Sequence, residues 1–188
     1  MRSRTWVASA LSGALAVATV VASVGVGTAA ASGTAAKTAS HSRTALAPCL
    51  GADLKVTLGR SEGTAGTSYQ RIHVANTGSR ACTVSGYPRV SFRNAAGQPV
   101  GLPSLHQNFT GVPIRVITIE PGRLAHTDVA IPDAFNFPRH SCKPRDTRRL
   151  RFTPPHRSLS HVFAYRTTIC TTEDGRTMVG PMRRGRGQ

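Results

Sequence analysis

The sequence predicts an all-β domain, an antiparallel sandwich of about eight or nine short strands that is closed by two disulfides. Three observations lead to this fold class. Apolar residues alternate with polar ones at a period of two, turn residues separate these stretches at short intervals, and the chain contains an even number of cysteines. No stretch shows a convincing helical period, so helices are expected to contribute little.

The strands are predicted from alternation along each segment. Leu54, Val56 and Leu58 share one face of a segment whose other face is polar, which is typical of a half-buried strand. Pro121 and Gly122 predict a tight turn between two such segments. We expect the region 132–147, which is rich in proline and basic residues, to be a long irregular loop. The strands are expected within residues 53–58, 72–76, 82–84, 90–92, 114–120, 124–131, 149–153, 162–170 and 177–182.

The four cysteines are Cys49, Cys82, Cys142 and Cys170, and none belongs to a C-x-x-C pair. This spacing argues against a zinc ribbon or a thioredoxin-like redox motif. Two disulfides are therefore expected, and three pairings are possible. We favour Cys49–Cys82 and Cys142–Cys170, which close two separate loops.

The beginning of the chain has the pattern of a secretory signal peptide. Arg2 and Arg4 precede a weakly apolar stretch that carries no charge as far as Ala36, and Ala29 and Ala31 form an A-x-A cleavage pattern. We expect residues 1–31 to be a signal peptide for the general secretory route, so that no stable membrane anchor remains after cleavage. A retained transmembrane anchor is the alternative. Residues 32–48 then form a disordered leader, 49–182 the β-sandwich domain, and 183–188 a basic flexible tail.

The chain is strongly basic, with 24 lysine and arginine residues against 8 aspartate and glutamate residues and a formal net charge of +16. Such a surface attracts polyanions with a strength that falls as salt rises. A coding bias toward arginine is the alternative explanation. The densest basic segment carries Arg139, Lys143, Arg145, Arg148, Arg149 and Arg151. Because Pro138 and Pro144 interrupt it, we expect a loop with exposed side chains.

One run of residues resembles a known family. The run from Asn76 to Val90 contains N-x-G, Cys82, an apolar residue and Gly86-Tyr87-Pro88. It resembles the actinobacterial secreted domain of unknown function four-two-three-two. Further matches are Cys49, Gly97, Pro121-Gly122, Thr153-Pro154-Pro155, Cys170 and Val179-Gly180-Pro181. The resemblance covers roughly Cys49 to Met182. It implies an immunoglobulin-like sandwich, export and two disulfides, and it implies no activity. The basic segment 139–151 departs from the family's pattern.

No local motif of catalysis is present, whether a nucleophile elbow, a zincin helix, a P-loop or a dinucleotide fingerprint. Glu173 and Asp174 are the only adjacent carboxylates, and a turn beside Gly175 explains them without catalysis. Four residues of the C-terminal half could suggest a metal site, but an oxidised cysteine is no ligand; they are His140, Cys142, His156 and His161. We therefore expect no catalytic residue, no metal site and no cofactor.

The function predicted from the sequence is that of an exported, non-catalytic binding domain with a basic surface. An anionic envelope polymer or an acidic glycan is the expected partner. Aromatic residues make up only 5% of the chain, so stacking of nucleic acid bases is not expected and neither is specific nucleic acid binding. We expect a monomer. The alternatives are an exported hydrolase whose catalytic residues come together only in space, and a purely structural domain.

Overall fold

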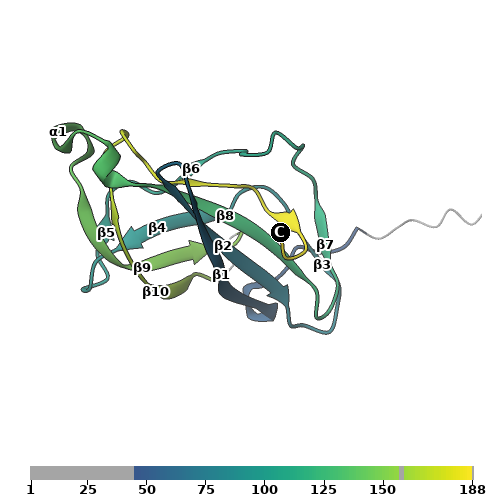
Figure 1. Ribbon diagram of the computed structural model, residues 1–188. Coiled ribbons are helices and arrows are strands. Elements are labelled where there is room, and N and C mark those ends of the chain that lie inside the picture. Colours follow the sequence, from purple (N-terminus) through teal and green to yellow (C-terminus); the bar gives the residue numbers. More distant parts are fainter. Residues whose placement is uncertain (1–44, 157–158, 188) are drawn as a thin grey trace, which may run out of the picture. The chain divides into compact units, whose positions relative to one another are not determined.

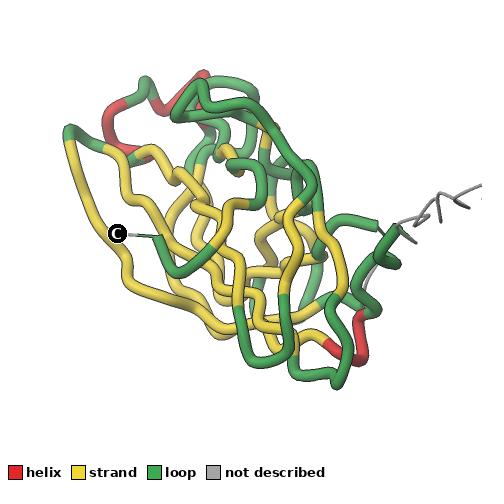
Figure 2. The backbone as a smooth tube through the Cα atoms, turned by 90° about the vertical axis from the view of Figure 1, so that its right-hand side faces the viewer, coloured by secondary structure: helices red, strands yellow, loops and turns green. Residues whose placement is uncertain are grey.

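The structure is a computed structural model, and it describes residues 45–156 and 159–187. The predicted signal peptide and most of the predicted leader lie outside the described residues. Two sheets lie in two layers with the hydrophobic core between them (Figures 1 and 2). The fold is thus all-β, as the alternation predicts, and short helical turns connect some of the strands.

The six-stranded sheet is built on three long antiparallel strands. These are β1 (Leu54–Thr64), β2 (Thr67–Asn76) and β8 (Leu124–Pro132). The short strand β11 (Met178–Val179) extends the sheet beside β8 and pairs in parallel with β6 (Leu105–His106). The strand β12 (Arg183–Arg184) also pairs with β8.

The four-stranded sheet forms the second layer in the order β10-β9-β4-β5. Its strands are β10 (His161–Ile169), β9 (Arg145–Thr153), β4 (Arg89–Arg93) and β5 (Pro99–Val100). A two-stranded sheet of β3 (Cys82–Val84) and β7 (Ile117–Ile119) adds to the core. The helical turns are η1 (Gly51–Asp53), η2 (Ala134–Asn136) and α1 (Arg139–Cys142).

The core contains the inward side chains of both layers. Phe92, Leu150 and Phe152 come from the four-stranded sheet, and Ile72 and Val74 come from the six-stranded sheet. All five are fully buried. Burying each of these side chains stabilises the fold by about 1.5–3 kcal/mol, so the alternation that places them inward also fixes the faces of both sheets.

The predicted strands agree with the structure best where the alternation is long. The predicted strand 53–58 falls in β1 except for Asp53, which ends η1, while 72–76 falls in β2 and 124–131 in β8. The prediction for 114–120 was too long, because only Ile117–Ile119 forms a strand and Val116 is exposed. The structure has twelve strands in its described part, more than the eight or nine predicted, because several are only two residues long.

Three segments that we expected to be irregular have regular structure. The predicted loop 132–147 contains η2 and α1, and β9 already begins at Arg145. The predicted flexible tail pairs with β8 through β12. The end of the predicted leader also pairs, since Pro48 bridges to Thr83 and the Thr83 amide donates to the Ala47 carbonyl at 2.9 Å. Backbone groups in these segments find hydrogen-bond partners within the domain, and this overrides the local composition.

Both disulfides are present in the pairing we favoured. Cys49–Cys82 fastens the start of the domain to β3, and Cys142–Cys170 fastens α1 to the end of β10. The second bridge is buried beside Ala134 and Phe137 in a small separate cluster. This cluster holds the connection between β8 and β9 against the rest of the domain.

Two residues of the family-like run have clear structural roles. The Asn76 side chain is fully buried and donates to the Arg80 carbonyl at 2.7 Å and the Ile119 carbonyl at 2.8 Å, while its oxygen accepts from the Gly78 amide at 2.9 Å. It thereby joins β2 to the end of β7. Gly86 has a φ of 79°, which favours glycine, and its carbonyl accepts from the Met182 amide at 2.9 Å.

Replacing Asn76 by alanine is expected to lower the free energy of unfolding by about 2–3 kcal/mol, because two carbonyls and one amide lose their partner. Asn94→Ala is the matched control, since Asn94 makes hydrogen bonds only within the exposed β4–β5 turn. Urea unfolding of both variants measures the difference. Equal losses in the two variants would contradict the role of Asn76 as a buried junction.

Each disulfide is expected to stabilise the domain by about 3–4 kcal/mol on the chain-entropy model, since the bridges join residues 33 and 28 positions apart. Thermal unfolding with and without a reductant measures their combined effect. A thiol assay on unfolded, unreduced protein should detect no free thiol. Two free thiols per chain, or a melting temperature unchanged by reduction, would contradict the expectation.

Candidate functional site

The strand β9 separates apolar and basic side chains onto its two faces. Leu150 and Phe152 are fully buried in the core, whereas Arg149 and Arg151 are exposed on the opposite face. The pairing with β10 shifts register between Ala164 and Thr167. Near this shift Arg148 and Arg149 are both exposed although they are consecutive. Two residues of β10, Tyr165 and Arg166, oppose the single residue Arg148 at this shift, so the bulge lies in β10 and interrupts the alternation beside Arg148.

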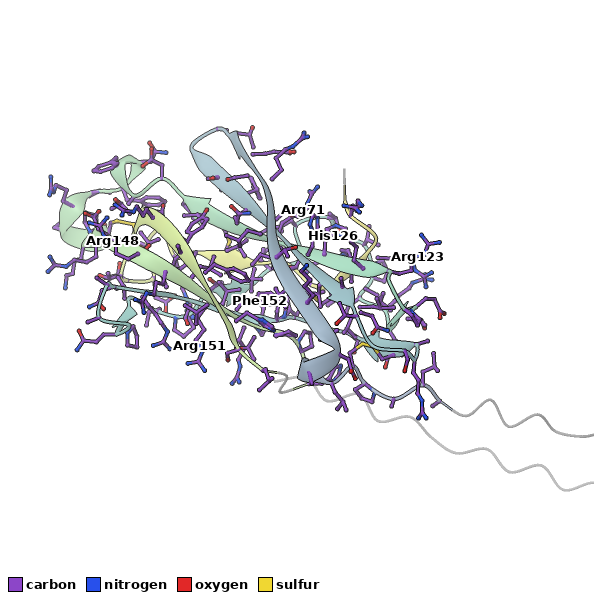
Figure 3. The ribbon with its side chains drawn as sticks, turned by 90° about the horizontal axis from the view of Figure 1, so that it is seen from below. Arg71, Arg123, His126, Arg148, Arg151 and Phe152 are labelled. Carbon is purple, nitrogen blue, oxygen red and sulfur yellow. A yellow bond between two sulfur atoms is a disulfide. The ribbon has the colours of Figure 1, made fainter. Side chains whose placement is uncertain are left out.

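The neighbouring strands add further arginines to the same face. Arg149 lies directly opposite Arg93 of β4, and Arg151 lies opposite Ser91. Residues opposite each other in a sheet share a face, so Arg93 points outward beside Arg149. We call this surface the arginine face; it consists of Arg89, Arg93, Arg148, Arg149, Arg151 and Arg166. Arg148 and Arg151 lie along the same side of the domain, and Arg123 lies at its other end (Figure 3).

The arginine face has almost no negative charge to balance it. The ion pairs of the described residues involve Arg60, Arg71 and Arg176, none of which belongs to this face. Asp146 is the only carboxylate in the strands of the four-stranded sheet, and it accepts a hydrogen bond from the Thr168 hydroxyl at 2.7 Å. The positive potential of these guanidinium groups is therefore not neutralised by a carboxylate of the sheet, and all of them except the partly buried Arg93 are exposed.

Few of these guanidinium groups are engaged by the protein itself. Arg93 donates to the Gly97 carbonyl at 2.6 Å, and its buried Nε has no partner in the described part of the chain. Arg151 donates to the Ser160 hydroxyl at 3.0 Å. The remaining donors of the face are free to bind a ligand that accepts hydrogen bonds, and a phosphate or carboxylate group matches the planar guanidinium fork.

The structure divides the predicted basic segment into two parts. Arg148, Arg149 and Arg151 lie on the arginine face, whereas Arg139, Lys143 and Arg145 lie at α1 and at the beginning of β9. The expectation of one exposed loop was wrong, because β9 pairs on both sides and forces alternate residues inward. Sequence reasoning missed three members of the face: Arg89, Arg93 and Arg166. Their alternation with buried residues was visible, but the pairing of β4 with β9 was not.

The structure gives other roles or positions to residues that the sequence suggested as metal ligands. Cys142 is oxidised in a disulfide with Cys170, so its sulfur is not available as a ligand. His156 contacts the Ser85 hydroxyl at 3.4 Å, and His161 lies in β10.

Within residues 45–156 and 159–187, no helix is long and apolar enough to cross a membrane.

A second cluster of titratable groups lies on the six-stranded sheet. His73 of β2 lies directly opposite His126 of β8, and both contact the end of the chain. His126 Nδ1 donates to the Gly185 carbonyl at 2.8 Å, and His73 Nε2 donates to the Arg186 carbonyl at 3.0 Å. Burial lowers the pKa of His126 and outweighs the Gly185 hydrogen bond, which raises it. Burial also lowers the pKa of His161.

The fold and the arginine face together define a disulfide-bonded, all-β domain with an arginine-rich sheet surface. The chain belongs to the family described as "Domain of unknown function (DUF4232)", which matches residues 49–183. The match confirms the family to which we related the run from Asn76 to Val90. The search of the curated proteins found no match to the chain.

Acidification is expected to destabilise the domain. A histidine with a lowered pKa binds fewer protons in the folded state than in the unfolded state, so the free energy of unfolding falls as the pH falls below the ordinary value of 6.5. His126→Gln should make the free energy of unfolding depend less steeply on pH, and the remaining dependence should include the contribution of His161. Urea unfolding between about pH 7.5 and pH 5 measures this dependence. His140→Gln on the exposed α1 is the control, and identical slopes in the two variants would contradict the expectation.

Proposed function

We propose that this protein is an exported, non-catalytic domain that binds anionic polymers through the arginine face. An envelope polymer that carries phosphate groups, or an acidic glycan, is the partner. The observation that supports this proposal most directly is the presence of six arginines on one face of the four-stranded sheet, none of them paired with a carboxylate among the described residues. The two disulfides are consistent with export, because such bonds persist in oxidising surroundings.

The geometry of a sheet suits a ligand with regularly repeated charges. Adjacent strands are about 4.8 Å apart, and residues on the same face of a strand are about 6.8 Å apart. Arg93 and Arg149 are neighbours across strands, and Arg149 and Arg151 are neighbours along β9. A flexible anionic chain can place successive charged groups over such positions, and each guanidinium can donate two hydrogen bonds to one of them.

The arginine face includes an arrangement that folding alone does not favour. Like charges directly opposite each other on two strands are destabilising, and Arg93 and Arg149 form such a pair. An anionic ligand between the two guanidinium groups would remove the repulsion. Local departures from the rules of stability are expected at functional sites, which favours binding over a purely structural role.

A hydrolase is the alternative function, and it needs a cavity where a histidine and a carboxylate converge. A small cavity of about 240 Å³ is lined by both His73 and Glu62. However, His73 Nε2 already donates to the Arg186 carbonyl, and Glu62 lies 3.9 Å from the Arg60 guanidinium. Among the described residues no hydrogen bond joins His73 to Glu62, and the Glu62 side chain is 54% exposed, so the two groups do not form a positioned acid–base pair and we prefer the binding function.

The decisive experiment compares three variants that test position rather than charge. The first replaces Arg89, Arg148, Arg149 and Arg151 by serine. The second replaces four exposed arginines that lie elsewhere, Arg80, Arg115, Arg123 and Arg184. The third replaces Arg139, Lys143 and Arg145. Retention on heparin and on a polyphosphate resin is measured over a salt gradient. The first variant should elute at a clearly lower salt concentration than the second, although both lose the same charge.

Equal shifts in the first two variants would mean that net charge alone controls retention. If the unsubstituted protein does not bind either resin below about 0.1 M salt, where the screening length is near 10 Å, polyanion binding itself is contradicted. Arg71, Arg89 and Arg93 are unsuitable as controls, because Arg71 pairs with Asp128 at 2.9 Å and the other two belong to the arginine face. Arg149→Ser alone should weaken retention without lowering the free energy of unfolding.

A further inference from the structure

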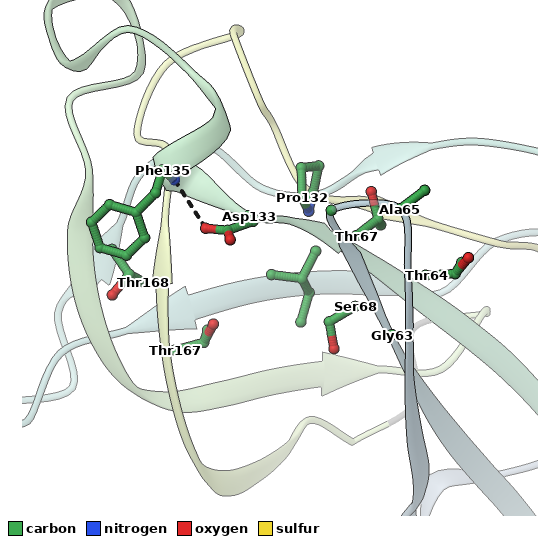
Figure 4. Close-up of a pocket in the computed structure, with 12 residues that line it drawn as sticks. Gly63, Thr64, Ala65, Thr67, Ser68, Pro132, Asp133, Phe135, Thr167 and Thr168 are labelled. Atoms are coloured by element: carbon green, nitrogen blue, oxygen red, sulfur yellow. Dashed lines mark hydrogen bonds between the residues drawn. The ribbon is translucent and has the colours of Figure 1, made fainter.

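A cavity of about 540 Å³ lies beside the tip of the β1–β2 hairpin and reaches the end of β10 that follows Arg166. The hairpin residues from Gly63 to Ser68 form one wall, and the end of β8 and Asp133 form another. Thr167 and Thr168 of β10 form a third wall, and Phe135 stands on that side of the opening (Figure 4). The proposed polyanion site contains none of these residues.

The cavity is lined by hydroxyl groups that the described part of the chain leaves without partners. No hydrogen bond there involves the hydroxyls of Thr64, Thr67 or Thr167. The Ser68 hydroxyl forms a hydrogen bond with the Ser61 hydroxyl at 3.1 Å. One carboxylate oxygen of Asp133 accepts a hydrogen bond from the Phe135 amide at 3.0 Å. The second carboxylate oxygen of Asp133 remains available. The lining thus offers several donors and acceptors at once.

Phe135 is the most exposed large apolar side chain among the described residues, with 74% of its surface accessible. It belongs to η2, where Asp133 caps the turn. An aromatic ring held in solvent contributes nothing to the core, so it is an informative exception to the burial of apolar residues. A flat ring beside polar groups is the arrangement that binds a ligand with one apolar face and one polar edge.

The walls of the cavity are held together before any ligand arrives. Ala65 and Gly66 both have positive φ values, 45° and 77°, which gives the two-residue turn of a tight hairpin. The Gly66 carbonyl accepts from the Asp133 amide at 2.8 Å and from the Asn136 side chain at 3.4 Å. The hairpin tip is therefore tied to η2, and little ordering is needed on binding.

The charge of the lining decides which ligand fits. Asp133 is the only charged residue in it, so an anionic ligand would be repelled. We propose that this cavity binds a neutral sugar residue. The apolar C–H face of the sugar packs on the Phe135 ring, and its hydroxyls bond to the Asp133 carboxylate and to the unpartnered threonine hydroxyls, whereas the Thr168 hydroxyl already donates to Asp146. A cationic ligand is disfavoured because a single exposed ring does not form an aromatic cage.

Titrations by NMR test the proposal with four neutral disaccharides: maltose, cellobiose, mannobiose and diacetylchitobiose. At least one should shift the amide signals of Phe135, Thr167 and Thr168, with a dissociation constant of about 0.1–10 mM. Phe135→Ala should weaken binding at least about tenfold, and Phe135→Trp should restore it. Thr167→Val, which keeps the shape but removes the hydroxyl, should weaken it by a smaller factor.

Val162→Ala is the control, since Val162 is also exposed but lies on β10 beside Arg151. The variant with serine at Arg89, Arg148, Arg149 and Arg151 should bind the disaccharide as tightly as the unchanged protein. The experiment therefore distinguishes failure of the sugar proposal from failure of the polyanion proposal. The sugar proposal is overturned if none of the four disaccharides binds at about 50 mM. It is also overturned if the shifts fall outside the cavity, or if choline binds there and the sugars do not.

Discussion

The burial of one face of β9 is the constraint on which the rest of the structure depends. Leu150 and Phe152 fill the centre of the core, and they fix which residues of β9 and its two neighbours point inward. A slip of one residue would bury arginines and expose both apolar side chains, so the register is strongly determined. The outward position of Arg149 and Arg151 is therefore a consequence of core packing, and the arginine face arises from the same alternation that stabilises the sandwich.

The two proposed sites differ in charge and in rigidity. The arginine face is broad, positive and built on regular strands, which suits an extended polymer whose charges repeat. The cavity beside Phe135 is an open depression with one charged residue, bordered by β10 and by turns that hydrogen bonds hold in place. A domain that holds a charged polymer on one surface and a neutral sugar residue at another would recognise composite envelope glycans better than either site alone.

Besides the core, the buried hydrogen bonds of Asn76 and the two disulfides stabilise the domain. Asn76 joins β2 to β7, and each disulfide fastens a segment that composition alone would leave irregular. These fastenings offset features that oppose folding, such as the opposed arginines of β4 and β9. Asn76 and Gly86 of the family-like run bind backbone groups of other segments, and neither residue belongs to either proposed site.

The sequence by itself determined the all-β fold class, the two disulfides and most of the long strands, because these follow from local alternation and from cysteine count. It also indicated a basic segment, but it placed Arg139, Lys143 and Arg145 with Arg149 and Arg151 because they are close in the chain. Only the tertiary structure decided that Arg93 lies opposite Arg149 and that Phe135 stands beside Thr168. The physical reason is that strand pairing joins residues far apart in sequence, and a single sequence carries no local signal of which strands become neighbours.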